Sequence, residues 1–341
     1  MPNSLKPLLF TFFVLLLLNP PVHADEHISF KYETAKITSE HLEKEKQIYI
    51  HLPSSYSEEK KRTYPVLYVL NRPENFLISS QIVDFLSSKE NIPETIVVGI
   101  PHSGNSRFEY SPYDGDTRRE EMDSFHRFLK EDIFPYINST YRTTPSKAIV
   151  GHSLAGLFVT DLFIHEPDLF NSFIALSPSY HHGKPVLEDM RTFLKTHDTN
   201  DKVFYASLGS DEYYRIENEY LRMQQIFNET TPEGLRWDIG DIRNASHRSL
   251  ILPGLIDALS FIYEGYNLSM PQFRKQGYNG IVAHYAQLSK ELGIKVTPSK
   301  GDIEGLLRYF SNPDRKNDPD IAPHLNDYIE DLKRLLKHFY S

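Results

Sequence analysis

The stretch Ala148-Ile149-Val150-Gly151-His152-Ser153-Leu154-Ala155-Gly156 decides the fold of this chain. An apolar run breaks at a glycine, a serine follows, and small residues lead into a second apolar run. This order predicts a strand, a sharp turn and a helix, with the hydroxyl of Ser153 lifted clear of the backbone beside the first free amides of the helix. We therefore expect Ser153 to be a nucleophile; the alternative is an ordinary N-cap residue.

Short β-rich runs alternate with amphipathic stretches up to about residue 265. We expect strands at 47–52, 64–70, 95–100, 147–150, 172–177, 202–208 and 235–239, and helices at 79–87, 120–141, 154–165 and 214–227. This alternation predicts an α/β fold, a mostly parallel sheet with helices on both faces. Together with the strand, turn and helix around Ser153, the expected type is the α/β-hydrolase fold. In such a sheet the active groups gather at the carboxyl ends of the strands.

The two ends of the chain differ from this central domain, which we place at residues 25–268. Residues 1–24 carry Lys6, then an apolar run and a small-residue site ending at Ala24, which is typical of a secretory signal peptide. The apolar run is shorter than the ~20 residues of a membrane anchor. We therefore expect cleavage, no integral membrane span afterwards, and a periplasmic or secreted protein. Residues 269–341 predict helices alone, at 278–293, 300–310 and 321–340, as a C-terminal helical extension.

Composition limits the partners and cofactors. The formal charge of −9 argues against nucleic acid. The chain has no cysteine, no His-Glu-x-x-His motif and no glycine-rich phosphate loop. We expect no metal and no cofactor, a small-molecule substrate, and no disulfide support for the fold. The oligomeric state cannot be predicted.

A nucleophilic serine needs a base and an acid, which follow it in the order serine, acid, histidine in α/β-hydrolases. The expected strand at 202–208 leads into Asp211 and Glu212, and we predict Glu212 as the acid with Asp211 as its rival, because adjacent side chains point in different directions. His247 follows both and lies in the polar stretch after the last expected strand, so we predict it as the base. His152, within the elbow, is not favoured by this order.

The oxyanion requires backbone amides. We expect the N–H of Leu154 and a second amide from the loop after strand 64–70, which begins Asn71-Arg72. Loss of one such donor typically costs ~3 kcal/mol of transition-state stabilisation.

Beyond the elbow, several stretches carry a resemblance to a known family: Tyr64-Pro65-Val66-Leu67-Tyr68-Val69-Leu70, Val97-Val98-Gly99-Ile100-Pro101, Phe134-Pro135-Tyr136-Ile137, and Leu169-Phe170 before Ser177-Pro178-Ser179. From about Tyr49 to Tyr266 the chain resembles the "putative esterase" family of α/β-hydrolases, most nearly its siderophore-esterase branch of the enterobactin and salmochelin type. The resemblance implies that Ser153 and His247 are nucleophile and base and that Glu212 is the acid.

The chain departs from the family pattern at two places in the expected site. Asn71-Arg72 stands where Asp-Gly is usual, so the oxyanion amide would come from Arg72, whose backbone would need a shape that glycine reaches more easily. Tyr180-His181-His182 replaces the usual bulky aromatics after Ser179. We expect Arg107 and Tyr180 to contact the substrate, and Arg107, Arg72 or Lys184 would suit an anionic siderophore.

The predicted function is a serine carboxylic-ester hydrolase that acts through an acyl-enzyme on siderophore-type or other small esters. An acyltransferase with the same three residues, and a non-catalytic binding protein on a hydrolase scaffold, stay open as alternatives.

Overall fold

The quoted stretch folds as a strand, a turn and a helix. In the computed structural model, which describes residues 30–102, 109–115 and 117–341, β7 (Thr143–His152) runs into Ser153, and α5 (Leu154–His165) starts at the next residue. Contacts divide the chain into two units, Met1–Lys31 and Tyr32–Ser341, and the sheet and its helices belong to the second. The expected signal segment at 1–24 lies outside the described residues.

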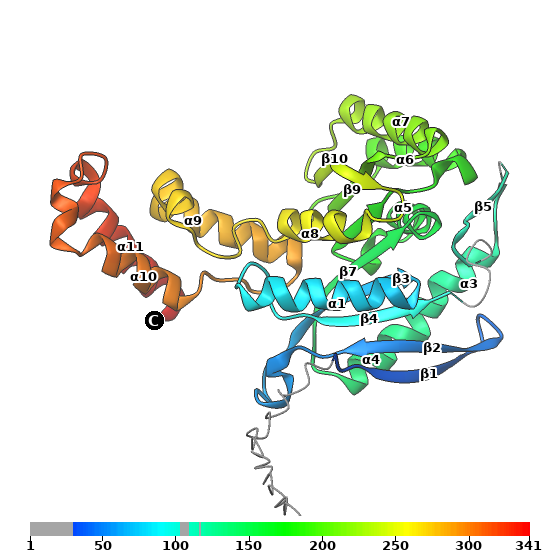
Figure 1. The fold of residues 1–341 in the computed structure, drawn as a ribbon, viewed down its shortest axis with the longest axis horizontal. Helices are drawn as coiled ribbons and strands as arrows, with labels where there is room; N and C mark the ends of the chain where they lie inside the picture. The colour runs from blue at the N-terminus through cyan, green and yellow to red at the C-terminus, as the bar shows by residue number, and fades with distance from the viewer. Residues whose placement is uncertain (1–29, 103–108, 116) are drawn as a thin grey trace, which may run out of the picture. The chain divides into compact units, whose positions relative to one another are not determined.

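The main sheet of the described chain has eight strands in the order β1-β2-β4-β3-β7-β8-β9-β10 (Figure 1). β1 and β2 pair antiparallel, as do β2 and β4, and every other neighbouring pair is parallel. Besides β7, this sheet contains β1 (Glu33–Ser39), β2 (Lys44–His51), β3 (Tyr64–Asn71), β4 (Ile96–Pro101), β8 (Ser172–Leu176), β9 (Val203–Asp211) and β10 (Arg236–Ser246). The expected α/β-hydrolase fold is confirmed.

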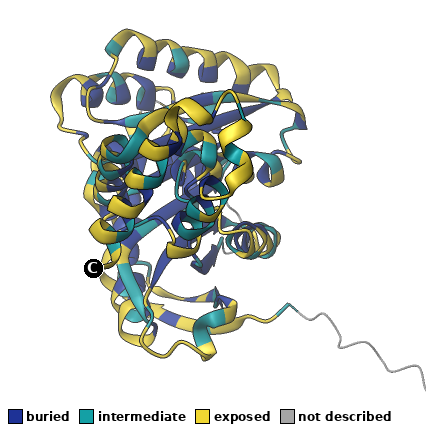
Figure 2. Cartoon of the chain, turned by 90° about the vertical axis from the view of Figure 1, so that its left-hand side faces the viewer, coloured by how far each residue is buried: buried dark blue, intermediate teal, exposed yellow. Residues whose placement is uncertain are grey.

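Helices cover both faces of this sheet because alternate strand residues are apolar on both sides. On one face Phe163 of α5 packs against Phe173 and Phe204, with ring centroids 5.1 and 4.9 Å away. On the other, α8 (Ile251–Ile262) lies close enough that a Cβ at Gly254 would be 3.2 Å from Leu176, and α1 (Pro73–Ser88) packs beside α8. Figure 2 shows buried strands between helices whose outer turns are exposed.

The remaining elements lie between these. The helices are α3 (Glu121–Arg127), α4 (Phe134–Thr140), α6 (Pro185–Thr196), α7 (Tyr214–Thr230) and a π-helical segment (Phe128–Ile133). A small hairpin joins β5 (Tyr113–Asp114) and β6 (Thr117–Arg118), and 3₁₀ turns occupy Ser54–Ser57, Pro167–Leu169, Tyr180–His182, Pro313–Asn317 and Ala322–His324. The expected helix at 120–141 is therefore three segments.

The two strands that lead to the predicted acid and base run further than expected. β9 extends to Asp211 and β10 to Ser246, although we expected ends at 208 and 239. The pairing of β10 with β9 shifts register between Ile242 and Ser246. The polar residues that we assigned to a loop therefore belong to an irregular end of the strand. As a result, Glu212 and His247 each directly follow a strand end.

The C-terminal part is helical, as expected, with α9 (Met270–Leu292), α10 (Lys300–Phe310) and α11 (Leu325–Tyr340). α9 begins eight residues earlier than predicted and kinks at Gly277, whose φ is 61°. Phe273 of α9 and Phe310 of α10 both pack against Tyr328 of α11, with ring centroids 5.7 and 4.9 Å away. The boundary at 268/269 stays a prediction. Among the described helices, none has the length and apolarity needed to cross a membrane.

Candidate active site

Ser153 occupies a backbone conformation that few residues adopt. Its φ of 61° and ψ of −118° place it outside the helix that follows, and its side chain makes no capping hydrogen bond to that helix. The crowding is severe, since a Cβ at Gly151 would lie 2.1 Å from the carbonyl oxygen of Ala155. The hydroxyl is thus held at the surface of the turn, free to contact groups from other loops.

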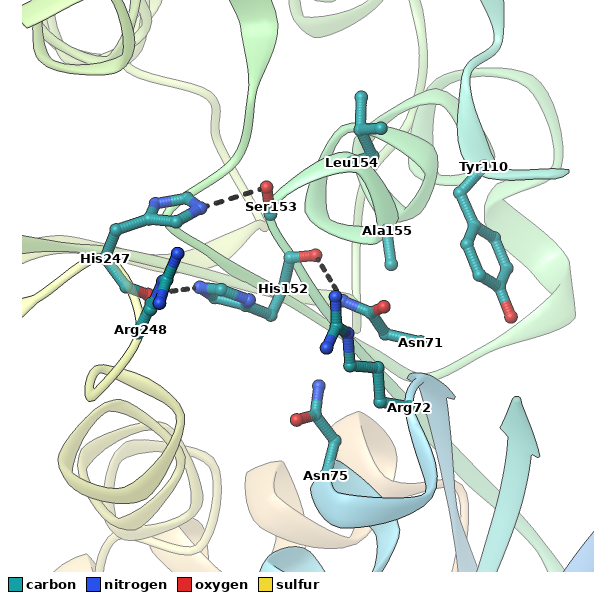
Figure 3. Close-up of a pocket in the computed structure, with 10 residues that line it drawn as sticks. All are labelled: Asn71, Arg72, Asn75, Tyr110, His152, Ser153, Leu154, Ala155, His247 and Arg248. Atoms are coloured by element: carbon teal, nitrogen blue, oxygen red, sulfur yellow. Dashed lines mark hydrogen bonds between the residues drawn. The ribbon is translucent and has the colours of Figure 1, made fainter. Parts of the chain in front are cut away.

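The three residues predicted as serine, base and acid lie together. His247 Nε2 is 3.1 Å from Ser153 Oγ, and His247 Nδ1 is 3.0 Å from Glu212 Oε2 (Figure 3 draws the first contact). The Glu212 side chain is 2% exposed and that of His247 is 15% exposed. Asp211, the rival acid, is the exposed last residue of β9, so the alternation of the strand directs it elsewhere.

The hydrogen bonds around Glu212 fix the tautomer of His247. The carboxylate accepts from the hydroxyl of Ser177 at 2.6 Å and from the N–H of Tyr213 at 2.7 Å. An ionised carboxylate can only accept, so His247 Nδ1 carries the hydrogen in this contact. Nε2 is then the bare nitrogen, and it accepts from the hydroxyl of Ser153.

The two amides expected for an oxyanion belong to helix starts. Leu154 is the first residue of α5 and Arg72 is the N-cap of α1, positions whose N–H groups have no acceptor within the helix. Our expectation of an unusual backbone at Arg72 is wrong: its φ is −114°, and the positive φ of 93° falls on Asn71 instead. Asparagine tolerates this conformation, and its Nδ2 donates to the carbonyl of His152 at 3.2 Å.

A cavity of ≈430 Å³ opens beside Ser153. The guanidinium groups of Arg72 and Arg248 reach toward it in Figure 3. Its lining residues are Asn71, Arg72, Asn75, Tyr110, His152, Ser153, Leu154, Ala155, His247 and Arg248. The opening is polar and carries positive side chains, although the chain as a whole has a formal charge of −9.

His152 contacts the backbone of His247, the predicted base, and not Ser153. Its Nε2 donates to the backbone carbonyl of His247 at 2.6 Å, and the two ring centroids are 4.7 Å apart. Burial lowers the pKa of His152 to about 4, and the neighbouring His247 adds to this effect. His152 is therefore neutral near pH 7 and holds the loop that carries His247.

Tyr180, one of the two residues predicted to contact substrate, does not line the cavity beside Ser153. Tyr180 is fully buried, and its hydroxyl bonds Thr160 Oγ1 at 2.9 Å and the sulfur of Met223 at 2.7 Å. The prediction that Tyr180 contacts substrate is therefore wrong, because the 3₁₀ turn directs the ring into the core. Arg107 lies outside the described residues. Lys184 lines a separate hollow with His181 and Arg215.

Sequence reasoning missed two serines of the site. Ser177 contacts Glu212, and Ser179 Oγ lies 3.0 Å from Ser153 Oγ. The only signal was their place in Ser177-Pro178-Ser179, directly after the strand next to the elbow. A place directly after a strand puts both serines at the carboxyl-end edge of the sheet, where the site lies, but it does not identify their partners.

Comparisons with known proteins identify the family. A family model described as "Putative esterase" matches residues 39–226. Ferri-bacillibactin esterase BesA of Bacillus subtilis (strain 168) is 26% identical over 238 residues, covering 61% of this chain and 82% of BesA.

Solved structures share the fold. An IroE-like serine hydrolase from Shewanella oneidensis superposes with a TM-score of 0.72 at 22% identity, covering 91% of this chain and all of that one. The siderophore hydrolase EstA from Aspergillus nidulans gives 0.58 at 20% identity, covering 68% of this chain and 94% of that one. The "Putative esterase" model matches more than half of the chain, so the chain belongs to that family.

Proposed function

We propose that the protein is a serine ester hydrolase that works through an acyl-enzyme on Ser153. His247 is the general base, Glu212 orients it, and the backbone N–H groups of Leu154 and Arg72 hold the oxyanion. The single observation that carries this proposal is the 3.1 Å contact from Ser153 Oγ to a histidine nitrogen whose tautomer Glu212 fixes.

The reaction follows from these positions. Ser153 Oγ attacks the ester carbonyl as its proton passes to His247 Nε2, and the imidazolium is stabilised by Glu212 on its other side. His247 then gives the proton to the departing alcohol oxygen. Water, deprotonated by the same nitrogen, attacks the acyl-enzyme and releases the acid, which restores the hydroxyl of Ser153.

For the substrate, we propose small esters of the siderophore type. The similarity to BesA supports this class. So do Arg72 and Arg248 at the cavity, because cationic side chains attract an anionic ester even in a chain of negative net charge. We further propose that the protein is exported with cleavage after Ala24, for which the pattern of residues 1–24 is the support.

The test is a hydrolysis assay of the purified protein on 4-nitrophenyl acetate, a feruloyl ester and a catecholate tri-lactone. We expect turnover that Ser153→Ala abolishes, while Ser172→Ala, buried at the far end of β8, leaves it unchanged. Turnover that survives in Ser153→Ala would remove the proposal. Added methanol separates a transferase, which forms the methyl ester in preference to the free acid.

A further inference from the structure

The turn after β8 brings two buried hydroxyls to the site. Ser177 and Ser179 are 0% and 3% exposed, and Ser177 has a φ of 39°. Backbone bonds hold the turn in place: the N–H of Ser177 donates to Ser207 O at 2.8 Å, and the N–H of Ser179 donates to Ser153 O at 3.1 Å. The position of the Ser179 side chain is therefore fixed relative to the elbow.

The hydrogens between Ser179 and Ser153 can be assigned by elimination. Ser153 has one hydroxyl hydrogen, which goes to His247 Nε2 because that nitrogen carries none. The 3.0 Å contact between the two serine oxygens still needs a donor. Ser179 must supply it, so Ser153 Oγ accepts a hydrogen bond from Ser179 while it donates one to His247.

This arrangement matters when charge develops on Ser153 Oγ. As the proton leaves for His247, the oxygen becomes partly anionic, and a hydrogen bond to an anionic oxygen is roughly twice as strong as one between neutral groups. The same charge returns to Oγ when the acyl-enzyme breaks down and Ser153 departs. A fixed donor at this atom therefore favours the transition states of both steps.

We propose that Ser179 is a further catalytic residue, whose hydroxyl donates to Ser153 Oγ and stabilises the charge on that oxygen during acylation and deacylation. The O–H bond of Ser179 does not break, and no group is transferred to it. The inference rests on the proposed function, since it requires Ser153 to be the nucleophile.

Ser177 provides a useful contrast in the same turn. Its hydroxyl contacts Glu212 Oε2, the oxygen that also bonds His247, and it does not touch Ser153. Loss of Ser177 acts through the acid and base, whereas loss of Ser179 acts at the reacting oxygen.

The experiment compares Ser179→Thr with Ser179→Val, which have the same shape and differ in the hydroxyl, together with Ser179→Ala. Steady-state turnover of 4-nitrophenyl acetate and the rate of labelling by a fluorophosphonate are measured for each folded variant. We expect Ser179→Val to lie about tenfold below Ser179→Thr in kcat and in labelling rate, at equal KM. Ser179→Ala should show the same loss relative to wild type.

Equal rates for Ser179→Thr and Ser179→Val, with Ser179→Ala within twofold of wild type, would overturn the inference. So would a loss confined to KM, because a role at Oγ changes kcat and the labelling rate. Ser153→Ala distinguishes this result from failure of the proposed function: an inert Ser153→Ala beside a fully active Ser179→Ala defeats the role of Ser179 alone.

Discussion

Glu212 and Asp211 are neighbours with opposite environments. Glu212 is buried against His247 and accepts from Ser177 and Tyr213, whereas Asp211 is exposed at the end of β9. We predict that Glu212→Gln lowers kcat by about 10³-fold or more, because an amide no longer fixes the histidine tautomer or stabilises the imidazolium. Steady-state kinetics measure this effect.

Asp211→Asn is the matched control and should stay within about twofold of wild type, since an exposed carboxylate away from the imidazole contributes little. A large loss in Asp211→Asn with full activity in Glu212→Gln would reverse the assignment of the acid.

His152 links the site to stability at low pH. Its pKa is lowered to about 4 in the folded protein, so between pH 6.5 and 4 the unfolded chain binds the extra proton and folding loses stability as the pH falls. We predict that this group accounts for about 2 kcal/mol of the stability lost between pH 7 and pH 5. Urea unfolding at the two pH values, for wild type and His152→Gln, measures it.

Glutamine can still donate to the carbonyl of His247 but does not titrate. The loss between pH 7 and pH 5 should be smaller by that amount in the variant. An identical pH dependence in both proteins would show that His152 is not the buried neutral group described.

The sharp turn between β7 and α5 depends on the absence of a side chain at Gly151. A Cβ there would lie 2.1 Å from the carbonyl oxygen of Ala155, a backbone atom that cannot move without disrupting α5. We predict that Gly151→Ala destabilises the protein by at least about 3 kcal/mol, measured by urea unfolding.

Gly240 in β10 supplies the control, because its Cβ would have only Asp238 Oδ2 nearby, at 4.0 Å. Gly240→Ala should change the free energy of unfolding by no more than about 0.5 kcal/mol. Equal stabilities for the two variants would contradict the crowding argument.

The sequence around Ser153 and the order of the site residues along the chain predicted the turn and its partners. The break at Gly151 and the small residues around Ser153 predicted the elbow, and the chain order of Ser153, Glu212 and His247 predicted which groups meet there. The π-helical segment at Phe128–Ile133 was missed because one extra residue in a turn leaves the apolar spacing of Phe125, Phe128 and Leu129 intact.

Contacts that no rule of chain order covers could not be predicted. Ser179 and Ser153 are 26 residues apart, and Ser177 and Glu212 are 35 apart. Their meeting depends on a turn with a positive φ at Ser177, which serine rarely adopts. The inward direction of Tyr180 depends on the same turn, so an aromatic residue beside the site was mistaken for a substrate contact.

A partly buried ion pair joins the C-terminal helices to the sheet. Arg236 of β10 and Glu291 of α9 are 2.6 Å apart, with side chains 23% and 8% exposed. We predict that Glu291→Ala lowers the free energy of unfolding by about 2 kcal/mol, since it leaves the partly buried guanidinium of Arg236 without its counter-ion. The cavity lining includes no residue of these helices, so kcat/KM should not change.

Glu304→Ala removes the exposed partner of Lys300, 3.8 Å away, and should cost no more than about 0.5 kcal/mol. Urea unfolding and esterase assays of both variants measure these effects. A loss of kcat/KM in stable Glu291→Ala would instead give the C-terminal helices a part in the reaction.

The most direct test of the account is the mass of the protein after reaction with a fluorophosphonate, followed by mapping of the modified peptide. If His247, oriented by Glu212, activates Ser153, the protein forms one adduct per chain, on Ser153. No adduct forms in Ser153→Ala or after unfolding in urea. An unmodified wild type that is folded, or an adduct on any other residue, would contradict it.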